Sequence, residues 1–127
     1  MGEKRTYNRI SVEIPGTLYK GKYEIPIQIA NISENGIGFR YKYRDCPADF
    51  IINTGNEVNI SFFDKHGSFS NEPAIQLCMF KTVHLRRHSS HAYIGGKLIK
   101  SESNYPQYVL DKKSQRFIYT IRGIQFC

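Results

Sequence analysis

The feature that most restricts how this chain can fold is the alternation of apolar and polar residues through most of its first hundred or so positions. A period of two is typical of β-strands that bury one face and expose the other. Six segments show it, at residues 10–19, 23–29, 37–43, 58–62, 75–79 and 92–99. Pro15 and Gly16 interrupt the first segment, so we expect a bulge or a bend there.

The period changes near residue 104, where apolar residues begin to recur at helical spacing. They are Tyr105, Tyr108, Val109, Phe117, Ile118 and Ile121. Asn104 is a suitable N-cap with Gln107 three positions later, and Gly123 is a stop signal. The pattern predicts a helix over residues 104–122. Because residues 111–115 are polar, this helix should cover an end or side of the sheet structure.

Six antiparallel strands and one helix favour a small closed β-barrel, because closure removes the exposed strand edges that a flat sheet would leave. Nine Tyr and eight Phe, with no Trp, are available to fill its interior. A chain of 127 residues fits one domain. Within residues 1–127 we expect the barrel over 10–100 and the helix over 104–122. Cys78 lies in an apolar run and should be a small core residue.

The charge and cysteine content favour some partners and compartments over others. Eighteen Lys and Arg against eleven Asp and Glu leave a net charge of +7, which favours an acidic partner without naming it. The first residues lack the apolar core of a signal peptide, and no apolar run is long enough to cross a bilayer. Three widely spaced cysteines suggest neither a disulfide framework nor a zinc knuckle. We therefore expect a cytoplasmic protein that does not insert into membranes.

Two short motifs carry the functional prediction. Arg5 and Arg9 form an Arg-x-x-x-Arg pattern ahead of the first strand, and arginine forks bind phosphate bidentately and stack on purines. Asn31, Ser33 and Gly36 form Asn-x-Ser-x-x-Gly on the turn between the second and third strands. They offer an amide edge, a hydroxyl and room for close approach of a ligand to the backbone. Together the motifs predict a site for an anionic nucleotide.

With strands flanking them in this order, the motifs resemble the signature of PilZ domains, the bacterial receptors for the second messenger cyclic di-GMP. The resemblance implies a six-stranded barrel of the split-barrel type, followed by a helix. It also implies that residues 1–9 form an arm that folds over the ligand and signals to a partner in motility, exopolysaccharide or pilus machinery. The ligand-binding residues would be Arg5, Arg9, Asn31, Ser33 and Gly36, with Lys4 and Arg40 as further candidates.

Asn31 departs from the aspartate that many PilZ domains have at this position. A carboxylate could accept both guanine donors as a charged acceptor, whereas an amide offers one neutral acceptor together with donors. Weaker affinity at a surviving site is therefore expected.

Several other functions remain open at this level. A PilZ-type adaptor without ligand, or a barrel that binds single-stranded nucleic acid, is an alternative, although the exposed ring platform of the latter is missing. His84, His88 and His91 fall in a predicted hairpin without a carboxylate or cysteine, so no metal is expected. Neither an enzymatic constellation nor a cofactor site stands out. The chain could equally be a complete receptor or a domain of a longer protein.

Overall fold

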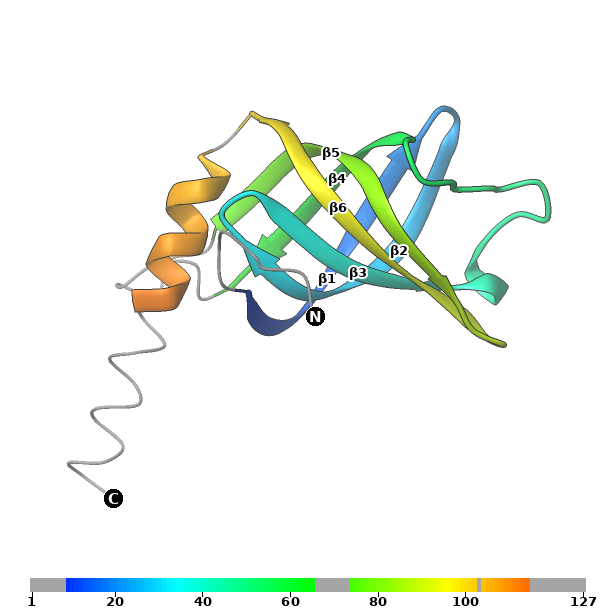
Figure 1. Ribbon diagram of the computed structural model, residues 1–127, viewed down its shortest axis with the longest axis horizontal. Coiled ribbons are helices and arrows are strands. Elements are labelled where there is room, and N and C mark those ends of the chain that lie inside the picture. The colour runs from blue at the N-terminus through cyan, green and yellow to red at the C-terminus, as the bar shows by residue number, and fades with distance from the viewer. Residues whose placement is uncertain (1–8, 66–73, 103, 115–127) are drawn as a thin grey trace, which may run out of the picture.

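The computed structural model describes residues 9–65, 74–102 and 104–114. Its six strands are β1 (Ile10–Lys20), β2 (Tyr23–Ser33), β3 (Gly36–Lys42), β4 (Glu57–Asp64), β5 (Ala74–Arg87) and β6 (His91–Ser101). They close into a barrel in the order β1-β2-β3-β6-β5-β4, and every neighbouring pair is antiparallel (Figure 1). The predicted fold class, a mainly β protein with a six-stranded antiparallel barrel and a C-terminal helix, is confirmed.

The inward positions of the strands supply the core. Each strand of the barrel contributes apolar side chains that are almost completely removed from solvent, among them Leu18, Ile25, Ile29, Phe39, Ile60, Phe80 and Ile94. Cys78 is buried with them, as predicted, and burial raises the pKa of its thiol. Burying a side chain of this size contributes about 1.5–3 kcal/mol to folding. The alternation read from the sequence is therefore the pattern that fills this barrel.

The predicted interruption at Pro15 and Gly16 is wrong in its position. Pro15 pairs with Gln28 in regular register, and the β1–β2 register shifts earlier, between Ser11 and Ile14. Pairing of β1 with β4 begins only at Gly16, so the missing N–H of Pro15 interrupts no ladder on that side. A Cβ on Gly16 would lie 2.9 Å from the Ser61 carbonyl oxygen. Gly16 therefore allows β4 to approach β1 closely instead of breaking the strand.

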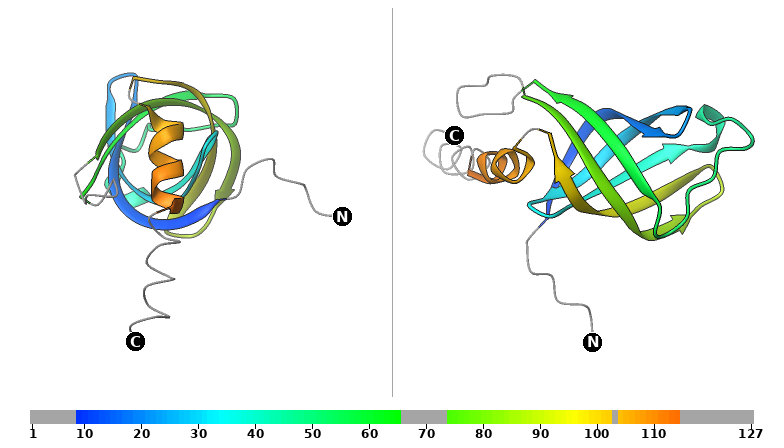
Figure 2. Two further views of the ribbon diagram at one scale, coloured as in Figure 1. Left: turned by 90° about the vertical axis from the view of Figure 1, so that its left-hand side faces the viewer. Right: turned by 90° about the horizontal axis from the view of Figure 1, so that it is seen from above.

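The helix over residues 105–114 lies across one end of the barrel, as both figures of the whole chain show (Figure 1, Figure 2). Tyr105 and Val109 are fully buried on the side of the helix that faces the barrel. The Tyr105 ring contacts the Phe80 ring edge-on, with centroids 5.5 Å apart. The Asn104 carbonyl accepts the first helical hydrogen bond, from Tyr108 N–H. The prediction that a helix covers an end or side of the barrel is confirmed.

Part of the predicted helix falls outside the residues that the structure describes. Phe117, Ile118, Ile121 and Gly123 fall outside the described residues. Gln107, expected to complete a capping box with Asn104, instead donates to Asp111 one turn further along. Within the three described ranges, no helix is long and apolar enough to cross a membrane.

The connections differ in small ways from the prediction. The third strand was expected to reach Tyr43, but β3 ends at Lys42 and Tyr43 begins the short 3-10 helix η1 (Tyr43–Asp45). Tyr43 N–H donates to the Ser90 carbonyl at 3.1 Å, so β3 ends beside the connection between β5 and β6. The fifth strand is longer than its apolar pattern, because β5 continues through polar residues to Arg87. The turn after residue 53 is as predicted, with Gly55 at a φ of 92°.

Candidate functional site

The barrel topology brings the second half of the arginine motif next to the asparagine motif. Arg9 directly precedes Ile10, and Ile10 pairs with Ile32, which lies between Asn31 and Ser33 in sequence. The Arg9 side chain is exposed to solvent. The chain therefore enters the barrel beside the turn that carries the second motif. Lys4 and Arg5, the other predicted cations of this segment, lie outside the described residues.

A β-bulge places Asn31 on the outside of the barrel. Ile29 faces the interior opposite Phe39, and strict alternation from it would point Asn31 inward and Ile32 outward. The register of β2 against β3 shifts between Ile29 and Asn31, so one extra residue is accommodated there. Ile32 consequently faces the core, where it is fully buried. Asn31 is left on the outer wall, the barrel face that points away from the core.

On the outer wall Asn31 meets a side chain that sequence reasoning did not single out. Asn31 Nδ2 donates a hydrogen bond to the Tyr93 hydroxyl of β6 at 2.6 Å. Asn31 Oδ1 is buried and accepts from no group in the part of the chain that the structure describes. The two side chains cross the strand between them at Gly38, which pairs with both Asn31 and Gly95. The only sequence signal was a second glycine at an outward position of β3, two residues after Gly36.

The motif was expected on the turn between the second and third strands, but Asn31 lies within β2. Only Ser33 and Gly36 form the ends of the tight turn between β2 and β3, which we call the signature turn (residues 33–36). Ser33 is buried, and its hydroxyl donates to the Asn35 side chain at 3.2 Å. A Cβ on Gly36 would lie 2.9 Å from the Gly96 carbonyl oxygen. Gly36 is thus required for the close approach of β6. Whether it also admits a ligand to the backbone, as the motif predicts, stays a prediction.

The signature turn is bound to the helix by two side-chain contacts. The Tyr105 hydroxyl donates to the Gly36 carbonyl at 2.6 Å, and Lys113 Nζ lies 2.7 Å from Glu34 Oε1. Burial raises the pKa of Tyr105 well above its ordinary value, against a backbone hydrogen bond at Ser33 that lowers it. Tyr105 therefore remains a hydroxyl donor at any physiological pH. Any ligand that contacts this turn also lies next to the attachment point of the helix.

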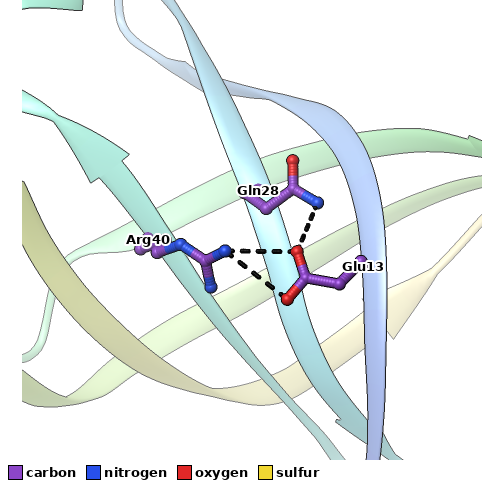
Figure 3. A network of polar contacts seen from close by, with 3 residues as sticks. All are labelled: Glu13, Gln28 and Arg40. Carbon is purple, nitrogen blue, oxygen red and sulfur yellow. Dashed lines mark hydrogen bonds and ion pairs between the residues drawn. The ribbon is translucent and has the colours of Figure 1, made fainter.

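Arg40, the further candidate on β3, is already engaged on the outer wall. Its guanidinium donates to Glu13 of β1 at 3.1 Å, and Gln28 of β2 donates to the same carboxylate at 2.9 Å (Figure 3). Arg40 also lines a half-open groove of about 800 Å³ that continues away from the signature turn. Lys42 and Arg44 line the same groove, where Asp45 is the one acidic residue among the described residues that line it. Arg40 is therefore placed between this groove and Asn31.

Two of the histidines that were considered as metal ligands lie at the tip of the β5–β6 hairpin. The rings of His88 and His91 stack with centroids 4.6 Å apart at the β5–β6 connection, while His66 lies outside the described residues. Among residues 9–65, 74–102 and 104–114, no group of three His, Cys, Asp or Glu side chains could hold a metal ion.

The chain matches one known protein family. A family model described as PilZ domain matches residues 3–90, more than half of the chain, so the chain belongs to the PilZ family. No curated protein matches it closely enough in sequence to be counted as a relative.

Solved structures agree on the fold. MotI/DgrA, the inhibitor of motility of Bacillus subtilis, superposes with a TM-score of 0.71 at 13% identity, covering 92% of this chain and 53% of its own. The PilZ domain of YcgR from Escherichia coli, solved with c-di-GMP, gives 0.67 at 12% identity and covers 95% and 98%. Intact YcgR with c-di-GMP gives 0.60 at 12% identity and covers 97% and 48%. The chain thus spans about half the length of MotI and of intact YcgR.

Proposed function

We propose that this domain is a receptor for cyclic di-GMP. The observation that carries the proposal is the position of Arg9, which directly precedes β1 where Ile10 pairs with Ile32, the residue between Asn31 and Ser33. A dinucleotide with two phosphates requires cationic forks and a base-reading amide within one small region. Membership of the PilZ family supports the same ligand, and the YcgR domain of similar fold was solved with it.

In the proposed complex the two arginines and the turn have different tasks. Arg5 and Arg9 bind phosphate and guanine with charge-assisted hydrogen bonds and stacking, which lysine cannot reproduce. Asn31 reads a base edge, while Ser33 and Gly36 shape the turn below it. Binding of the phosphates then fixes residues 1–9 against the outer wall. The surface created by this change is what a downstream partner would recognise.

The partner belongs, under this proposal, to motility, exopolysaccharide or pilus machinery. MotI is named for inhibition of motility, which makes motility machinery a reasonable first candidate to test. The receptor itself needs no metal or cofactor for this task, since recognition of the dinucleotide uses only side-chain donors and acceptors.

Isothermal titration calorimetry with cyclic di-GMP tests the proposal. Binding is expected for the natural chain, and Arg9→Ala should weaken it by about 1.5–3 kcal/mol, the range for hydrogen bonds to charged groups. Arg9→Lys should recover little of this loss. Lys81→Ala, which removes an exposed cation from β5 opposite Glu57, is the matched control and should leave affinity unchanged.

Two results would decide against a cyclic di-GMP receptor. One is the absence of heat with a chain whose circular dichroism shows it folded. The other is equal binding of a linear oligonucleotide, which would favour the nucleic-acid alternative.

A further inference from the structure

We infer that Tyr93 is a specificity-determining residue: its hydroxyl fixes the amide of Asn31 so that the domain selects guanine over adenine. This inference rests on the proposed function, because it concerns the base that the same site reads. It assigns a role to Tyr93 and to Gly38, neither of which belongs to the Arg-x-x-x-Arg or Asn-x-Ser-x-x-Gly motif.

Of the two polar atoms of the Asn31 amide, one has a partner among the described residues and the other has none. Nδ2 is held by the Tyr93 hydroxyl at 2.6 Å. Oδ1 is buried, and no donor in the described ranges satisfies it. A buried carbonyl without a donor costs about 1–3 kcal/mol, so a ligand that supplies one gains affinity from this site. Oδ1, the amide atom of Asn31 that has no partner among the described residues, is therefore an acceptor.

Gly38 makes this arrangement possible. A Cβ built on Gly38 would overlap the Tyr93 hydroxyl and would lie 2.6 and 2.7 Å from the two amide atoms of Asn31. Any side chain on Gly38 would therefore separate Tyr93 from Asn31. The backbone of β3 lies directly beneath their hydrogen bond because Gly38 pairs with Asn31 on one side and with Gly95 on the other.

The choice of base follows from the hydrogen-bonding inventory of an amide. A freely rotating Asn can bind adenine through two hydrogen bonds, donating from Nδ2 and accepting at Oδ1. Guanine instead presents two neighbouring donors, N1–H and N2–H, which a single carbonyl can accept. The Tyr93 hydroxyl takes one of the two Nδ2 protons and fixes the plane of the amide, so Asn31 can no longer turn to align Oδ1 and an Nδ2–H with adenine, whereas Oδ1 held in place still accepts from guanine. An aspartate would need no such orientation, because both of its oxygens accept.

The test compares cyclic di-GMP with cyclic di-AMP by calorimetry in four proteins: the natural chain, Tyr93→Phe, Asn31→Asp, and the double variant. Tyr93→Phe retains the ring and removes only the hydroxyl. It should reduce the preference for cyclic di-GMP about tenfold, the value of one hydrogen bond near the upper end of its usual range. In the Asn31→Asp background the same change should alter the preference much less.

An unchanged preference in Tyr93→Phe would overturn the inference, as would an equal change in both backgrounds. Gly38→Ala gives a second check and should lower the preference in the same direction as Tyr93→Phe. Thermal unfolding of each variant shows whether it is folded at the titration temperature.

A readout without ligand separates this inference from the proposed function. In the natural chain, NMR should show the Asn31 side-chain amide protons shifted and slow to exchange, and Tyr93→Phe should abolish both properties. If the natural chain binds neither dinucleotide, the proposed function is wrong. Amide protons that are indifferent to Tyr93→Phe would show that Tyr93 does not hold Asn31.

Discussion

Gly36 belongs to the proposed ligand-binding motif and also makes contacts that the fold itself requires. Its carbonyl is the acceptor for Tyr105, and its missing side chain leaves room for the Gly96 carbonyl of β6. Both contacts exist without a ligand. A glycine at this point of the motif is thus explained by the barrel and its helix, and its presence alone is weak support for binding. Asn31 and Arg9 are the more informative members of the motifs.

Removal of the Tyr105 hydroxyl should measure what this contact contributes to stability. Tyr105→Phe leaves the Gly36 carbonyl without its 2.6 Å donor, and the loss of this hydrogen bond is expected to cost about 1–2 kcal/mol. Tyr19→Phe is the matched control, because the Tyr19 hydroxyl accepts only a long hydrogen bond of 3.5 Å from Ser61. Urea denaturation monitored by circular dichroism compares the two. Equal midpoints for both variants would contradict the importance of the Tyr105 contact.

At the scale of strands and helices, the sequence was informative wherever local pattern and global fold agree. Six alternating segments predicted six strands, because each strand has one face in a shared core. The side of the sheet on which Asn31 lies was not predictable in the same way, because a bulge after Ile29 reverses the inward and outward alternation of β2. Tyr93 was hidden for another reason. Its partner Asn31 is distant in sequence and becomes a neighbour only when β3 pairs with both β2 and β6.

The helix offers a sharp test of its role in closing the barrel end. Val109 is fully buried, whereas its neighbour Leu110 is 45% exposed. Val109→Asp would bury a carboxylate without a partner and is expected to destabilise the domain by more than about 3 kcal/mol. Leu110→Asp should change stability by less than about 1 kcal/mol. Thermal unfolding of the two variants separates these cases, and similar losses would mean that the helix is not fixed on the barrel by this face.

At the scale of the whole molecule, the chain has a net positive charge, although individual cations near the proposed site are engaged in ion pairs. The net charge is +7, while Arg40 is paired with Glu13 and Lys113 with Glu34. Part of the positive potential near the proposed site is therefore already neutralised by contacts within the barrel. The groove beyond Arg40 retains Lys42 and Arg44 against the single acid Asp45. The overall charge was readable from composition, but its arrangement on the barrel required the register of the strands.

This arrangement predicts a salt dependence of binding that Arg9 carries in large part. Raising sodium chloride from about 0.05 M to about 0.5 M shortens the screening length severalfold and should weaken binding of cyclic di-GMP by the natural chain. The dependence should be shallower in Arg9→Ala, because one charge-assisted contact is already gone. It should be unchanged in Lys81→Ala, whose lost charge lies on β5. Calorimetry at the two salt concentrations measures this, and parallel slopes in all three proteins would contradict it.

The attachment of the helix to the signature turn has a consequence for genetics. Substitutions at Glu34 or Gly36 disturb contacts with Lys113 or Tyr105, so under the proposed function they are expected to alter protein abundance in the cell as well as signalling. Arg9 is exposed, and its replacement leaves those contacts intact. A strain carrying an Arg9 substitution therefore reports the loss of the signal itself. A strain with a substitution in the signature turn combines the effects of lower protein abundance and of altered signalling. Its phenotype can be interpreted only when the amount of protein is measured by immunoblot.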